Sequence, residues 1–113
     1  MRFISGTTDV DTVGDAERIR NTEERVLWAK FTALPTNRGI SYIGLVDVDA
    51  THATAQKGYP LFGTASGPFS RGSSENETNT LELDFRPGSV VCNVFYVDAT
   101  VAGDDVGWAM MLA

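Results

Sequence analysis

The chain has 113 residues, of which 42% are hydrophobic and 21% charged, so it can build one core and is too apolar for a disordered chain. Its net charge of −6 and its pI near 4.5 make a phosphate backbone a poor partner, which argues against nucleic-acid binding. No segment approaches the roughly 20 apolar residues of a membrane span, so no membrane partner is expected.

The first 25 residues are polar and mixed in charge, with isolated apolar residues at Val10, Val13 and Ile19. Such a segment does not supply a core of its own. A single helical turn capped by Asp15 and an extended segment that orders against a neighbour both fit this composition, and we favour the extended form. We therefore expect an N-terminal arm over residues 1–25 and a β-sandwich domain over residues 26–113.

Alternation with period two begins at Val26 and predicts a strand over residues 26–33. One face carries Leu27, Ala29, Phe31 and Ala33, and the other carries Val26, Trp28, Lys30 and Thr32. Turn-forming residues at 35–39 separate this strand from a second β-rich segment at 40–48. A hairpin is the simplest interpretation of the pair.

The middle of the chain contains many residues that favour loops and turns. Residues 59–62 form a short apolar patch that Pro60 restricts to a sheet edge or a loop. Residues 63–79 are rich in Gly, Ser, Thr and Asn and are predicted to form a long surface loop. Residues 80–85 then alternate cleanly and predict a strand.

The C-terminal part completes the predicted fold. Residues 90–97 are apolar on both faces, which is typical of a central strand covered on each side or of a strand whose outer face meets another subunit. Residues 106–112 alternate again and predict a last strand. Five or six strands without sustained helical periodicity indicate an all-β fold, either an antiparallel β-sandwich or a small barrel.

The residues that carry chemistry do not form a convincing catalytic or metal-binding set. His52 is the only histidine, and no Ser or Cys arrangement nearby makes a triad. Cys92 lies in an apolar segment, which favours packing over reactivity, and a single cysteine forms no intrachain disulfide. The acidic pairs at residues 9 and 11, 47 and 49, and 104 and 105 lack the spacing of a calcium loop. We expect no enzyme activity, cofactor or metal; a small hydrolase using His52 and acidic pairs is the weakest alternative.

Aromatic and basic side chains supply the candidates for contact with a partner. Aromatic residues are frequent anchors at protein interfaces and on sugar-binding surfaces, although most in a chain of this size belong to the core. The basic and apolar residues of the arm are suited to lying across a neighbouring subunit. The predicted partner-binding residues are Arg2, Phe3, Arg18, Ile19, Arg20, Trp28, Tyr42 and Tyr59.

Four short motifs follow one another along the chain: TNRGISYIG at 36–44, GYPL at 58–61, LELD at 81–84 and FYVDA at 95–99. This order resembles a pattern in small virion proteins of tailed phages, and the resemblance covers about residues 26–112. The chain is thus similar to capsid decoration, or cement, proteins. It departs from their pattern at residues 63–79, where a short Pro-Gly turn is expected.

The resemblance implies a jelly-roll-like β-sandwich on the outer surface of an icosahedral phage capsid. There the protein would bind the major capsid protein, bridge and stabilise neighbouring subunits, and associate with itself as a homotrimer or homodimer. The implied location is the capsid exterior of the virion, after synthesis in the host cytoplasm. The alternative is a receptor- or glycan-binding module of a phage fibre or tail, in which exposed aromatic residues hold the ligand.

Overall fold

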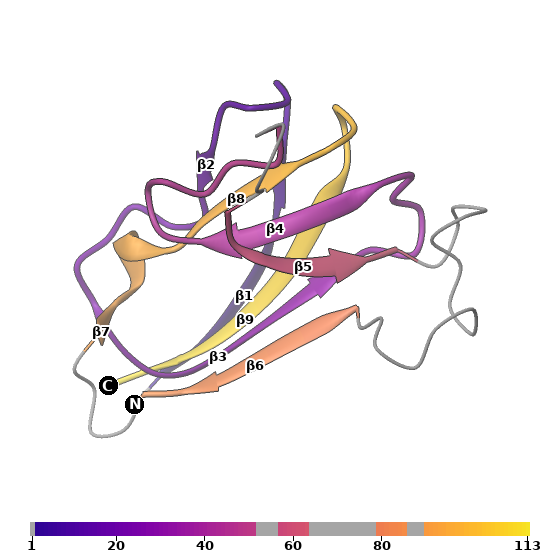
Figure 1. Ribbon diagram of the computed structural model, residues 1–113. Helices are drawn as coiled ribbons and strands as arrows, with labels where there is room; N and C mark the ends of the chain where they lie inside the picture. Colours follow the sequence, from indigo (N-terminus) through magenta and orange to yellow (C-terminus); the bar gives the residue numbers. More distant parts are fainter. Residues whose placement is uncertain (1, 52–56, 64–78, 86–89) are drawn as a thin grey trace.

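A computed structural model describes residues 2–51, 57–63, 79–85 and 90–113. These residues form two antiparallel sheets that face each other, as the two layers in Figure 1 show. The five-stranded sheet has the order β1 (Arg2–Asp9), β9 (Asp105–Leu112), β3 (Arg25–Ala33) and β6 (Thr80–Asp84), with β7 (Val90–Val91) also pairing with β3. The four-stranded sheet has the order β2 (Glu17–Arg18), β8 (Tyr96–Ala99), β4 (Ile40–Gly44) and β5 (Tyr59–Phe62). The predicted all-β, antiparallel class is confirmed.

The core lies between the two sheets and draws on both. Its fully buried apolar side chains include Val10, Val26, Phe31, Leu61, Val97, Val106, Met110 and Leu112. Phe95 stands at the centre, with its ring centroid 5.3 Å from that of Phe31 and 5.6 Å from that of Phe85. Burying a side chain of this size contributes about 1.5–3 kcal/mol, so this cluster is the main force that holds the layers together.

Strand β3 confirms the prediction for residues 26–33 but changes the phase of its alternation. Val26 and Ala29 are both buried, although simple alternation places them on opposite faces. The register of β3 against β9 shifts between Val26 and Trp28, so Leu27 is the extra residue of a β-bulge. The bulge lets both Val26 and the later Ala29 and Phe31 face the core.

The predicted hairpin of residues 26–33 and 40–48 is wrong, because β3 and β4 belong to different sheets. The connection is anchored to the start of β9. The Asn37 side chain donates to the Asp105 carbonyl (2.7 Å) and accepts from the Asp105 amide (2.9 Å). The Asp104 carboxylate accepts from the amides of Arg38 and Gly39, both at 2.9 Å. These contacts fix the chain as it crosses to the second layer.

The C-terminal predictions have mixed outcomes. The strands predicted at 80–85 and 106–112 are confirmed as β6 and β9. The single strand predicted at 90–97 is wrong: the chain forms β7, a 3-10 helix at Cys92–Val94 (η1), and then β8 in the other sheet. The apolar residues on both faces reflect this change of layer. His52 and residues 64–78 of the predicted loop lie outside the described residues.

The segment expected to be an N-terminal arm contributes to the two-layer fold. Arg2–Asp9 pairs with β9 without a break, from Arg2 opposite Leu112 to Asp9 opposite Asp105. Ile4 packs against the core, and Val10 and Ile19 are buried in it. Few apolar residues are needed here because β1 lies at the sheet edge and exposes one face. Residues 2–9 are therefore a strand and not a separate arm.

Candidate interaction surfaces

The structure separates the eight predicted partner-binding residues into five settings. Ile19 and Tyr42 are buried, Arg2 and Arg20 converge on one carboxylate, Phe3 stacks on Trp28, and Arg18 lines a groove, while Tyr59 is exposed on its own at 44%. The eight residues thus do not form one surface.

The expectation of exposure is wrong for Ile19 and Tyr42. Ile19 is 6% exposed and donates its amide to the Phe95 carbonyl (2.9 Å). Tyr42 is 8% exposed and packs with Val48 and Ala50, which fold back over the outer face of β4. Burial raises the pKa of the Tyr42 phenol above its usual value of 10.0. Both side chains stabilise the fold and are not available as contacts.

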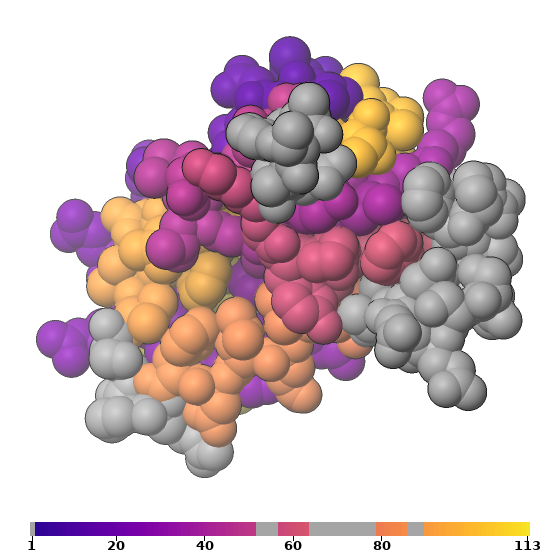
Figure 2. Space-filling model, in the orientation of Figure 1, coloured from indigo at the N-terminus to yellow at the C-terminus, as the bar shows by residue number. Residues whose placement is uncertain are grey.

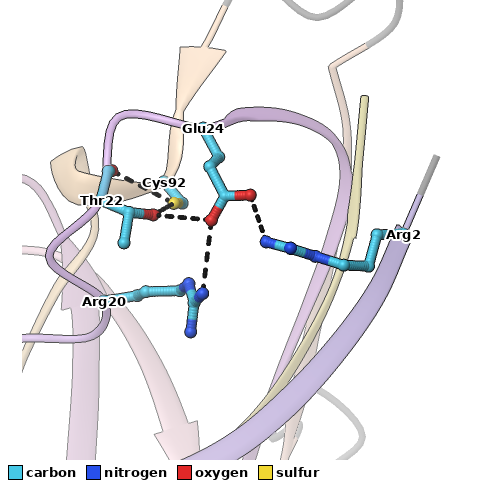
Figure 3. A network of polar contacts seen from close by, with 5 residues as sticks. All are labelled: Arg2, Arg20, Thr22, Glu24 and Cys92. Carbon is cyan, nitrogen blue, oxygen red and sulfur yellow. Dashed lines mark hydrogen bonds and ion pairs between the residues drawn. The ribbon is translucent and has the colours of Figure 1, made fainter.

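Arg2 and Arg20 both bind the Glu24 carboxylate, as Figure 3 shows. Arg20 Nη2 lies 3.3 Å from Glu24 Oε1, and the Thr22 hydroxyl donates to the same oxygen (3.2 Å). Thr22 also contacts the buried Cys92 thiol, at 2.7 Å between Oγ1 and Sγ. The network joins the end of β1 to the segment before β3 and to η1, and Cys92 has the packing role expected of it.

Phe3 and Trp28 form an apolar row on the outer face of the five-stranded sheet. Their ring centroids lie 6.4 Å apart with an interplanar angle of 26°. Met111 on β9 stands between them, since it pairs with Phe3 on one side and Trp28 on the other. Phe3 is 58% exposed, so the row is open to solvent at the edge of the sheet.

A groove beside the four-stranded sheet is a candidate site. It has a volume of about 430 Å³ and is lined by Arg18, Leu45, Val46, Asn93, Val94 and Tyr96. Leu45 and Val46 are 58% and 71% exposed, which is unusual for adjacent large apolar residues in a small domain. Figure 2 shows the molecule from the side of this sheet, with the magenta chain of β4 and its following turn beside the orange chain around β8.

Arg18 provides the positive charge of the groove. Its Nε and Nη2 donate to the Tyr96 hydroxyl, the first at 2.9 Å, and its Nη1 donates to Asn21 Oδ1 at 2.6 Å. The guanidinium carbon also lies 5.2 Å from the centroid of the Tyr96 ring. These three hydrogen bonds hold the guanidinium in a fixed orientation. Because a guanidinium has five N–H donors, it has further donors to offer a ligand.

A buried carboxylate anchors the loop that contains Leu45 and Val46. Asp98 on β8 is fully buried, and its Oδ2 accepts from the Ala50 amide (2.8 Å). Its Oδ1 accepts from the amides of Gly14 (3.0 Å) and Ala99 (2.9 Å). Asp98 thereby ties the loop after β4 and the loop after β1 to one strand. Within this loop the Val48 amide donates to the Leu45 carbonyl (3.0 Å), so Leu45 and Val46 stand in a hydrogen-bonded turn.

Sequence reasoning missed most of the groove. The sequence feature that could have revealed the groove is the pair Leu45-Val46 between Gly44 and the acidic Asp47. Two adjacent apolar residues in a turn cannot both face the core. The sequence pattern predicts a strand interior for Val94 and Tyr96, and their partial exposure follows from the break at η1.

The acidic pairs are engaged within the molecule. Asp104 accepts the two amides described above, and Asp49 Oδ1 accepts from the amide and the hydroxyl of Thr51. Asp9 lies opposite Asp105, and the hydrogen bond between their carboxyl groups raises the pKa of Asp9 above 3.8. Among the described residues, no three His, Cys, Asp or Glu side chains gather as metal ligands. The described part of the chain also contains no helix long and apolar enough to cross a membrane.

Comparison with known proteins gives no match at the level of a family model, a curated protein or a solved structure.

Proposed function

We propose that the protein is a structural, non-enzymatic protein that docks on a protein surface through the groove lined by Arg18, Leu45 and Val46. The observation that carries this proposal is the pair of exposed apolar side chains that stand in a hydrogen-bonded turn. An apolar centre with a bound Arg and an aromatic residue at its side is the composition of an interface core. Arg18 and Tyr96 supply these two components.

The resemblance to capsid decoration proteins gives this surface a specific partner. We propose that the chain is a jelly-roll-like cement protein on the exterior of an icosahedral phage capsid, where it bridges and stabilises neighbouring major capsid protein subunits. Many copies of a modest contact are sufficient on a shell, because repeated contacts add through avidity.

Shell binding tests the proposal directly. The purified chain is mixed with candidate phage shells that lack their decoration protein, and the particles are imaged by electron microscopy while the temperature of content release is recorded. Ordered added density and a raised release temperature are expected for the native chain. The double variant Leu45→Ser/Val46→Ser is expected to fold and to lose occupancy.

Tyr59→Ser is the matched control, because it removes another exposed large side chain that does not line the groove. It is expected to keep full occupancy. Equal occupancy of the groove variant and the control, or no binding by the native chain to any shell, would contradict the proposal.

A glycan-binding module of a phage fibre or tail is the second candidate. It is favoured by one feature of the groove, where the Tyr96 ring stands beside the polar side chains of Arg18 and Asn93. Aromatic and polar groups in this combination suit a sugar ring. Binding of the isolated chain to a glycan array, lost on Tyr96→Ala, would favour this function over shell docking.

A further inference from the structure

The free edge of β1 is the longest exposed strand edge among the described residues. β1 is a terminal strand of the five-stranded sheet, and β9 pairs with it on one side only. An unpaired edge presents a row of backbone N–H and C=O groups that can pair with another strand. The described chain supplies no strand on the outer side of β1.

Other sheet edges of this molecule carry the features that usually prevent pairing. β2 has only two residues, β5 contains Pro60, and β6 exposes the charged Glu82 and Asp84. β1 has eight residues with the sequence RFISGTTD, and no proline, lysine or bulge interrupts it. Its two charged residues, Arg2 and Asp9, stand at its ends. Within the described part of the chain, these edges are thus protected and the edge of β1 is not.

The backbone phase of β1 follows from its pairing with β9. The Val10 amide donates to the Asp104 carbonyl (3.1 Å) at the end of this ladder. Hydrogen-bonded positions alternate in an antiparallel pair, so the even-numbered residues of β1 bond to β9. Phe3, Ser5 and Thr7 therefore direct their N–H and C=O groups toward the free edge, and their side chains lie on the outer face with Trp28.

We propose that two copies of this chain associate through β1, edge to edge and antiparallel, so that their five-stranded sheets become one continuous sheet. A two-fold contact requires this direction, and the charges at the strand ends agree with it, with Arg2 and Asp9 on opposite faces of the sheet. In antiparallel pairing, Arg2 of one copy lies at the Asp9 end of the other copy's β1. Parallel pairing would place Arg2 beside Arg2 and Asp9 beside Asp9. Residues whose side chains lie on the same face of the sheet stand opposite each other across the seam. The two-fold axis therefore passes near Ser5 or Gly6, and nearly the whole strand is paired.

The pairing closes on itself. A two-fold contact uses the same edge on both copies, and the protected edges described above do not extend the sheet. A seam of one strand pair with the exposed Phe3 side chains is smaller than a standard interface of about 1,200–2,000 Å², so a dissociation constant on the order of micromolar is expected. This association does not depend on the proposed capsid function, because it needs only the protein itself.

Sedimentation equilibrium of the full chain, without any shell, tests the dimer. The mass is expected to rise from 12.2 kDa to twice that value as the concentration increases through the micromolar range. Ser5→Pro removes an outward N–H and no bond to β9, so it is expected to weaken association by about tenfold or more. Ser5→Ala is the matched control, because it keeps the N–H and is expected to dimerise normally.

Amide hydrogen exchange of the native chain gives a second measurement that does not depend on a variant folding. The amides of Phe3, Ser5 and Thr7 are expected to exchange slowly in concentrated solution and quickly on dilution, while those of Ile4 and Thr8 stay slow in both. A mass that stays at 12.2 kDa throughout, a species larger than a dimer, or fast exchange at Ser5 at every concentration would overturn the proposal.

Discussion

Buried polar residues, more than apolar ones, decide where the loops of this protein lie. Asn37, Asp98 and Asp104 are nearly or fully buried, and each binds backbone groups of a segment distant in sequence. A carboxylate that accepts backbone N–H groups satisfies donors that would otherwise be buried without a partner. In the sequence these acids looked like ordinary turn residues, and their role depends on the tertiary fold.

Asp98→Asn is expected to lower the free energy of unfolding by about 2–3 kcal/mol, because one acceptor becomes an NH₂ group that faces a backbone N–H. The three amides of Gly14, Ala50 and Ala99 then compete for a single oxygen. Urea unfolding followed by tryptophan fluorescence measures the loss. Asp47→Asn serves as the control, since Asp47 is exposed, and a change within about 0.5 kcal/mol is expected there. Equal effects of the two substitutions would contradict this role of Asp98.

At the scale of elements, β1 is the part of the fold whose importance the sequence understated. It contributes Ile4 to the core and covers one edge of β9, whose Met110 and Leu112 are fully buried. Removing it leaves the backbone groups of β9 unpaired beside exposed apolar surface.

Deleting residues 1–9 is therefore expected to abolish cooperative folding, and not to leave a folded domain without its arm. Near-ultraviolet circular dichroism and urea unfolding measure this outcome, with loss of the aromatic signal and of the transition. Phe3→Ser is the matched control: it removes an exposed side chain of the strand and keeps its backbone, so a near-native transition is expected. A deletion variant with the native unfolding midpoint would show that β1 is dispensable.

The sequence predicted strands more reliably than their partners. Residues 26–33, 80–85 and 106–112 alternate over a continuous face, and all three were found correctly. The bulge at Leu27 and the change of sheet at Cys92 depend on contacts with β9 and with the second layer. Such contacts join distant parts of the chain, so local periodicity carries no record of them. The groove was missed for the same reason, since residues 18, 45–46 and 93–96 meet only in the folded chain.

At the scale of the whole molecule, the two sheets share one core, and an acidic surface surrounds it. The net charge is −6, and part of the negative charge is concentrated where the ends of β1 and β9 meet. There Asp9 and Asp105 stand directly opposite each other, and like charges in such a pair destabilise a sheet. The two carboxyl groups share a hydrogen bond only when one of them is protonated, and this bond raises the pKa of Asp9.

This pair makes the stability of the molecule depend on pH in a defined direction. The pKa of Asp9 is raised above 3.8, first by the hydrogen bond with Asp105 and then by burial and the Asp105 charge, while a hydrogen bond with Asp11 acts in the opposite sense. A raised pKa means that the folded state favours the protonated carboxyl. Its stabilising contribution is complete below pH 3.8 and is lost as the pH rises through the folded-state pKa.

Asp9→Asn is expected to raise the thermal unfolding midpoint relative to the native chain at pH 7, and to give little or no increase below pH 3.8, where the native carboxyl is protonated as well. Calorimetry of dilute protein across this pH range measures the difference. Glu23→Gln removes one exposed negative charge without touching the pair, so it separates relief of the Asp9–Asp105 repulsion from a general reduction in net charge. An equal rise in both variants at pH 7 would assign the effect to net charge, whereas a rise in Asp9→Asn alone would place it at the junction of β1 and β9.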